Sequence, residues 1–119
     1  MNKFLNWFVL ILYMSVIFYY SSQERIDFLD KKPFSYIKVL RDKTLHVIEY
    51  FILALLTKNA FKTNKFLNEN LFLYSILFST LYGISDEFHQ LFVPGREFSF
   101  YDIFVDFVGS GLIIFLKLF

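Results

Sequence analysis

Long apolar stretches alternate with polar segments along this chain. The first stretch, residues 4–23, contains 20 residues without a charge, which suits one helical membrane crossing. The later stretches are shorter or carry a few ionisable groups, so we expect their helices to extend into the flanking polar residues. The pattern predicts an all-α integral membrane fold, with residues 1–119 forming a single domain of four transmembrane helices. Their approximate bounds are 4–22, 43–60, 70–90 and 100–118.

The first apolar stretch has two interpretations, a retained helix and a cleaved signal peptide. Lys3 precedes it, and Tyr13, Tyr19 and Tyr20 lie toward its far end, where an interfacial aromatic belt is expected. A signal peptide shares the basic start and the apolar run. The run is long for a signal core, however, and no small-x-small cleavage site follows it. We therefore expect a retained transmembrane helix.

Composition agrees with a membrane protein and excludes several other classes. Hydrophobic residues make up 56% of the chain and aromatic residues 23%, more than a soluble domain of this length could bury. The net charge of +1 argues against a nucleic-acid partner, which normally requires a basic surface. The absence of cysteine excludes disulfides, zinc–thiolate sites and cysteine nucleophiles.

Polar residues gather where three of the predicted helices reach one membrane face. Spacings of three and four residues arrange them in stripes, since such residues share a helix face. Ionisable groups at the membrane boundary are costly and by default indicate a functional site. The stripes are Lys43, His46 and Tyr50, with Glu49 at the flank, in the second helix; Asp86, His89 and Gln90 in the third; and Asp102 and Asp106 in the fourth.

Each stripe also has a structural interpretation. Charged groups in a helix bundle can simply pair and fix which helix faces which, and for Asp102 and Asp106 this interpretation weighs as much as a functional one. Tyr50 has the alternative role of an interfacial anchor. We interpret Gly109 and Gly111 in the last apolar stretch as residues that allow close helix approach.

A metal site is the competing chemical interpretation. The spacings His46-x-x-Glu49 and Asp86-x-x-His89 each place a histidine and a carboxylate at i and i+3, as in carboxylate-bridged helix bundles. Those bundles need two further helix-borne glutamates, which the sequence lacks. We therefore expect neither a metal nor another cofactor.

The polar residues together resemble the VanZ-like family of bacterial integral membrane proteins. Order and spacing agree over nearly the whole chain, although Asp106 occupies a position where asparagine is expected in many relatives. The motifs that carry the resemblance are Asp42-Lys43-x-x-His46-x-x-x-Tyr50, Asp86-Glu87-x-x-Gln90-x-x-x-Pro94-Gly95-Arg96 and Ser99-x-x-Asp102.

The resemblance implies a location and a side of the membrane. It implies four crossings of the bacterial cytoplasmic (inner) membrane, with cytoplasmic termini and the polar residues at the outer face. Lysine and arginine counts alone leave the orientation open, with five on the terminal side and seven on the other. The family's namesake is associated with resistance to the glycopeptide antibiotic teicoplanin, which points to the cell envelope.

Two functions remain open from the sequence. The first is an enzyme acting on a lipid-linked envelope molecule, with catalytic Glu87, Asp86 and His46: a carboxylate as general base and the imidazole as partner acid. The second is a non-catalytic membrane binding or scaffold protein whose buried charges are structural. Membrane lipids are the expected partners in both, and a lipid-linked envelope precursor is the expected ligand. The substrate-binding candidates are Lys43, Tyr50, Gln90, Arg96 and Asp102, with Arg96 suited to a phosphate or carboxylate.

Overall fold

The computed structural model describes residues 2–22, 34–94 and 98–118, with side chains at 2–22, 43–94 and 98–116. Within these residues every regular element is a helix, so the all-α prediction is confirmed. The helices are α1 (Lys3–Ser21), α2 (Phe34–Phe61), α3 (Lys65–Asn68), α4 (Leu71–Gln90), α5 (Phe100–Gly111) and α6 (Ile114–Leu118).

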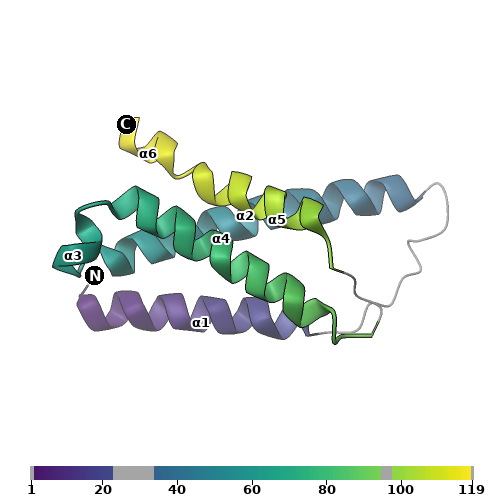
Figure 1. Cartoon of the computed structure of the whole chain (residues 1–119), viewed down its shortest axis with the longest axis horizontal. Coiled ribbons are helices and arrows are strands. Elements are labelled where there is room, and N and C mark those ends of the chain that lie inside the picture. The colour runs from purple at the N-terminus through teal and green to yellow at the C-terminus, as the bar shows by residue number, and fades with distance from the viewer. Residues whose placement is uncertain (1, 23–33, 95–97, 119) are drawn as a thin grey trace.

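The long helices α1, α2, α4 and α5 run lengthwise beside one another (Figure 1). α2 is central, since it packs against α1, α4 and α5, and α4 packs against α5 as well. One end of the bundle holds the start of α1, the short helix α3 and the end of α6, and we call it the terminal end (Figure 1). The other end holds the last turns of α4 and the first turns of α5, and we call it the site end.

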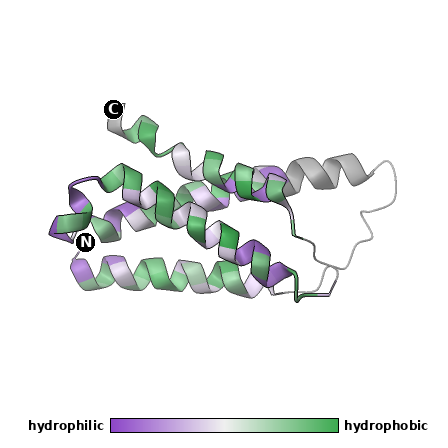
Figure 2. Cartoon of the chain, viewed as in Figure 1, coloured by the Kyte–Doolittle hydropathy of each residue, from purple (hydrophilic) through white to green (hydrophobic). Residues whose placement is uncertain are grey.

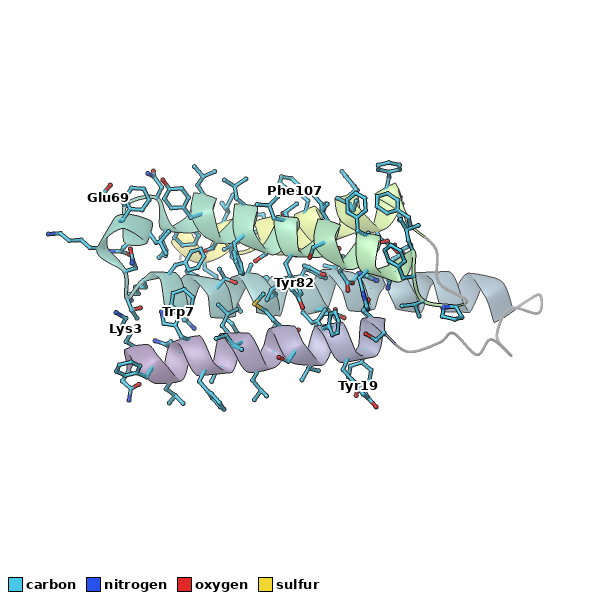
Figure 3. All side chains as sticks on the ribbon, turned by 60° about the horizontal axis from the view of Figure 1, so that its bottom comes forward. Lys3, Trp7, Tyr19, Glu69, Tyr82 and Phe107 are labelled. Atoms are coloured by element: carbon cyan, nitrogen blue, oxygen red, sulfur yellow. The ribbon has the colours of Figure 1, made fainter. Side chains whose placement is uncertain are left out.

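α1 is an integral part of the bundle. Leu10 is buried in its contact with α2. The Tyr13 hydroxyl donates to the backbone carbonyl of Glu49 at 2.9 Å, and the Tyr82 hydroxyl, which lies between the helices (Figure 3), donates to the carbonyl of Met14 at 2.6 Å. These contacts make α1 part of the packing of both α2 and α4, and its retention as a transmembrane helix stays a prediction.

The bundle exposes many large apolar side chains and buries several polar ones, and apolar residues run along every long helix (Figure 2). Large apolar side chains cover the outside of every long helix, among them Phe8, Ile52, Leu81 and Phe104. Soluble proteins rarely expose such continuous apolar surface, and rarely bury ionisable groups. The buried polar side chains include Thr57, Ser75, Ser79, Glu87, Gln90, Asp106 and Ser110.

Length and composition support a membrane crossing at one helix. Among the described residues, α1 is the helix that is long and apolar enough, with a mean hydropathy of 1.6 over 18 residues. α4 ends in turns that contain Asp86 and Glu87, and α5 has 12 residues before the chain breaks toward α6. The prediction of four transmembrane helices is therefore supported in part.

Two helix bounds differ from those predicted. α2 begins at Phe34 rather than near residue 43, so it extends well before its predicted start. No glycine or proline interrupts this segment, so the helix continues through its charged residues. The last predicted helix breaks after Gly111, where the Ile113 N–H bonds to the Ser110 carbonyl three residues back, in a tighter turn than an α-helix.

The two glycines of α5 differ in their surroundings. A Cβ added at Gly109 would lie 2.5 Å from the carbonyl oxygen of Val47, so this glycine lets α5 approach the backbone of α2. A Cβ added at Gly111 would meet no atom within 4 Å. The expected packing role is thus correct for Gly109 and wrong for Gly111.

Candidate functional site

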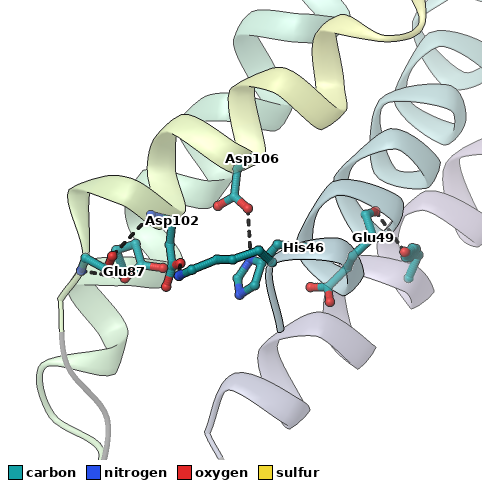
Figure 4. A network of polar contacts seen from close by, with 8 residues as sticks. His46, Glu49, Glu87, Asp102 and Asp106 are labelled. Carbon is teal, nitrogen blue, oxygen red and sulfur yellow. Dashed lines mark hydrogen bonds and ion pairs between the residues drawn. The ribbon is translucent and has the colours of Figure 1, made fainter. Parts of the chain in front are cut away.

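The site end brings polar side chains of α2, α4 and α5 together, as the stripes in the sequence predict (Figure 4). We call these residues the polar cluster. Several are almost completely buried, with Tyr50 and Glu87 0% exposed and Asp106 1% exposed. Arg96 lies outside the described residues. The polar cluster comprises Lys43, His46, Glu49, Tyr50, Asp86, Glu87, Gln90, Asp102 and Asp106.

A histidine–aspartate pair joins α2 to α5. The His46 Nδ1 and Asp106 Oδ1 atoms lie 2.9 Å apart (Figure 4). The described residues offer no partner to the other ring nitrogen of His46. A carboxylate at one imidazole nitrogen fixes the ring's orientation and tautomer, and leaves the second nitrogen able to exchange a proton.

Tyr50 lies one helical turn after His46 on α2. The two rings are nearly parallel, with centroids 6.3 Å apart and planes 8° from each other. The Tyr50 hydroxyl is buried and has no hydrogen-bond partner among the described residues. Complete burial excludes the role of an interfacial anchor, which requires the hydroxyl to reach water.

A second ion pair joins the same helices nearer the site end. The Lys43 ammonium binds the Asp102 carboxylate (Figure 4), and it lies 5.0 Å from the centroid of the Tyr101 ring. The Asp102 backbone N–H donates to the Ser99 hydroxyl at 3.2 Å, which caps the start of α5. Asp102 therefore compensates the charge of Lys43, so any anionic ligand must share this lysine with the carboxylate.

Glu87 connects α4 to the start of α5. Its Oε2 accepts a hydrogen bond from the backbone N–H of Ser99 at 3.0 Å, whereas its buried Oε1 has no partner in the described part of the chain. Ser99 thus serves both helices, as cap for α5 and as donor to α4. Asp86 and Gln90 are buried beside Glu87, on the same helix end.

Three buried oxygen atoms of the polar cluster lack a partner among the described residues: the Tyr50 hydroxyl, Glu87 Oε1 and Asp106 Oδ2. An unsatisfied buried polar group costs about 1–3 kcal/mol, so folded proteins retain few of them. Unpaired buried hydroxyls of Ser75, Ser79 and Ser110 lie elsewhere along the described helices. The site end differs because its unpaired oxygens belong to ionisable side chains, as in a site that receives a polar ligand or exchanges protons.

A family comparison agrees with the motifs. The model of the VanZ/LLP1 family matches residues 4–119. The chain belongs to the VanZ/LLP1 family. No curated protein and no solved structure matches it. Membership of this family and the apolar helix α1 together point to a membrane protein.

In this VanZ/LLP1 protein, His89 is not part of the polar cluster, contrary to the predicted stripe. Its Nε2 lies 2.8 Å from the Ser22 hydroxyl, and its ring stacks on Phe18 of α1 with centroids 4.4 Å apart. His89 and Gln90 project about 100° apart around α4, because a helix has 3.6 residues per turn. Gln90 therefore turns inward while His89 turns toward α1.

Gly83 is a residue of the site that sequence reasoning missed. A Cβ at this position would lie 2.6 Å from Asp106 Oδ2, so the absence of a side chain on α4 makes room for the carboxylate of α5. A glycine inside the apolar helix α4 lowers helix propensity, and an isolated glycine of this kind often has a packing reason. The sequence therefore contained a sign that Gly83 has a packing role, but it did not show that Asp106 is the residue packed against it.

The metal interpretation gains no support from the geometry. Within the described residues no group of three or more histidine, aspartate or glutamate side chains is placed to hold an ion. One of the two expected histidine–carboxylate pairs is also divided, because His89 faces α1 while Asp86 is buried. The polar cluster of this VanZ/LLP1 protein consists of hydrogen-bonding and ionisable groups paired across the helices.

Proposed function

We propose that this VanZ/LLP1 protein crosses the bacterial cytoplasmic membrane four times, through α1, α2, α4 and the pair α5–α6. The termini lie in the cytoplasm and the polar cluster lies at the outer face. The apolar exterior supports the crossing, since hydrocarbon is the solvent that favours such a surface. The arrangement of the termini supports an even number of crossings, because α1 begins and α6 ends at the same end (Figure 1).

Labelling of single introduced cysteines tests this topology. The wild-type chain has no cysteine, so it gives no background labelling. We expect Phe92→Cys, at a position 85% exposed at the site end, to react with a membrane-impermeant maleimide on intact spheroplasts. Lys65→Cys, at the exposed α3 turn of the terminal end, should react only after permeabilisation. Reaction of both in intact spheroplasts, or the reverse pattern, would contradict the proposed crossing.

The function that the geometry supports best is recognition of a lipid-linked envelope molecule and its hydrolysis or group transfer. Water or an acceptor hydroxyl replaces the leaving group, and the polar cluster carries the proton from the attacking oxygen to the leaving group. The observation that carries it is the His46–Asp106 pair beside buried oxygen atoms that lack partners. A lipid-linked molecule suits this position, because a site at the membrane boundary receives the head group while the lipid chain stays beside the apolar exterior.

The residues divide into three roles in this function. His46 exchanges the proton, and Asp106 is a positioning residue that holds the imidazole. Tyr50 and Glu87 offer a hydroxyl and a carboxylate oxygen to the head group. We retain Gln90 as a binding residue, and Arg96 as the group that binds a phosphate or carboxylate. Asp86, a catalytic candidate from the sequence, joins the binding residues in this proposal because it is buried beside Glu87.

A non-catalytic binding protein is the second candidate, and one observation favours it. Both ion pairs of the polar cluster, Lys43–Asp102 and His46–Asp106, join α2 to α5. Pairs that fix the arrangement of two helices have a structural purpose without any reaction. In that case the polar cluster binds the head group and leaves it unchanged.

Lipid mass spectrometry on the detergent-purified protein separates the two candidates. After incubation with a bacterial membrane lipid extract, we expect a lipid-linked envelope molecule to copurify and a product of different mass to accumulate. A copurifying lipid of unchanged mass would select the binding protein. Copurification no higher than with an unrelated four-helix membrane protein would contradict both candidates.

Tyr50→Phe provides a matched variant for this experiment, since it removes a single buried oxygen. We expect about tenfold weaker retention of the lipid, as is typical when a site loses a hydrogen bond to its ligand. The thermal stability of the lipid-free protein should stay equal or rise, because the hydroxyl has no partner among the described residues. Equal lipid retention in variant and wild type would remove Tyr50 from the site.

A further inference from the structure

The terminal end contains a polar cavity that is separate from the polar cluster. It has a volume of about 400 Å³ and is lined by Asn6, Asn59, Lys62 and Thr63. Asn6 comes from the second turn of α1 and is only 8% exposed, whereas Lys62 is exposed at the rim. Cavities of this size are large enough to hold a small ligand or a head group.

The walls of the cavity are held by contacts between α1 and the end of α2. The Trp7 indole N–H donates to the Thr63 hydroxyl at 3.2 Å, and the Trp7 and Phe61 rings lie 5.8 Å apart. Trp7 and Lys3 both lie at this end of α1 (Figure 3). The cavity is therefore part of the packed bundle rather than a gap between mobile segments.

The groups that line the cavity favour an anion. An ammonium and two carboxamides contribute N–H donors, and no carboxylate of the described residues lines the cavity. Three of the last four carbonyls of α2 are already occupied, since those of Lys58, Ala60 and Phe61 accept bonds from the three backbone N–H groups that follow the helix. The charged side chains described at this end are Lys3, Lys58, Lys62, Lys65 and Glu69.

We propose that this cavity binds a phosphate-bearing anion, through Lys62 and the amides of Asn6 and Asn59. A phospholipid head group is the source that the position of the cavity favours. Tryptophan and lysine side chains concentrate where apolar surface gives way to lipid phosphates. Trp7 contacts Thr63 of the cavity wall, and Lys3 lies at the same end of α1 (Figure 3). Anion binding itself is independent of the proposed reaction, because the cavity and the polar cluster lie at opposite ends of the bundle.

The single tryptophan of the chain reports on this cavity directly, because Trp7 contacts its wall. The full chain in detergent micelles is titrated with dioleoylphosphatidylglycerol, with dioleoylphosphatidylcholine and with inorganic phosphate. Sodium chloride at about 0.5 M shortens the Debye length to roughly 4 Å and suppresses diffuse attraction to the lysines. We expect a saturable change in Trp7 fluorescence with the anionic lipid, and about fivefold weaker binding in Lys62→Gln.

Lys65→Gln is the matched control, since this exposed lysine at the same end does not line the cavity. It should bind the anionic lipid as the wild type does. A saturable response to inorganic phosphate that depends equally on Lys62 would support the site and assign its source to a free anion. Equal weakening in both variants, an equal response to both lipids or no saturable response would overturn the proposal. Circular dichroism checks that Lys62→Gln folds.

Discussion

We expect the His46→Gln variant to retain the copurifying lipid-linked molecule but to convert it about 100-fold more slowly than the wild type, or slower still. Glutamine is polar and of similar size, but it cannot accept and release a proton near neutral pH. Conversion is measured as the ratio of product to unmodified lipid by mass spectrometry over time. His89→Gln is the matched control, because His89 contacts Ser22 and Phe18 outside the polar cluster.

Substitutions at Asp106 test its role as a positioning residue. Asp106→Asn keeps an oxygen that can accept the hydrogen bond from His46 Nδ1, so we expect it to lose less than about tenfold in conversion rate. Asp106→Leu has a similar size and no acceptor, and should lose about as much as His46→Gln. Equal losses in the two Asp106 variants would show that the carboxylate charge, not the orientation of His46, matters. Unchanged conversion in His46→Gln would exclude proton transfer by this residue.

The second large effect is expected at Gly109, where Gly109→Ala should destabilise the bundle by about 1–3 kcal/mol. The added Cβ would lie 2.5 Å from the Val47 carbonyl oxygen and 3.1 Å from its Cα. A backbone cannot rotate away as a side chain can, so α5 must move from α2. The measurement is thermal unfolding of the purified protein in detergent, followed by circular dichroism.

Gly111→Ala is the control for this prediction. A Cβ at Gly111 meets no atom within 4 Å, and alanine favours a helix over glycine, so its stability should equal or exceed that of the wild type. Equal destabilisation in the two variants would contradict the close approach of α5 to α2. Gly109→Ala should also weaken the His46–Asp106 contact, because Asp106 lies one turn earlier on α5.

Most of the residues that gather at the site end could be predicted from the sequence, whereas their pairings could not. Stripes at i, i+3 and i+4 identified Lys43, His46, Asp102 and Asp106, because helical periodicity is a local property. Which lysine or histidine meets which aspartate depends on the rotation and tilt of two helices about their axes. Those are set by long-range packing, in particular by the contact of Gly109 with α2.

Two errors share a cause. Both predictions assumed that all residues on one helix face meet the same neighbouring helix. One placed Asp86, His89 and Gln90 on a shared face, and the other expected close packing at Gly111. In the bundle α1 approaches one side of α4, and α2 and α5 approach the other, so adjacent positions such as His89 and Gln90 meet different neighbours. A periodic pattern gives the direction of a side chain relative to its own helix, but not the neighbour that it meets.

The sequence by itself determined that the chain is all helical, that its apolar residues exceed what a small soluble domain can bury, and that it carries the motifs of the VanZ/LLP1 family. Only the tertiary structure decided that His46 meets Asp106, that Glu87 binds the start of α5 through Ser99, and that Gly83 leaves room for a carboxylate. The physical reason is the range of the interactions. Helix formation and burial preference depend on nearby residues and composition, whereas a buried hydrogen bond depends on the positions of two helices to within a fraction of an ångström.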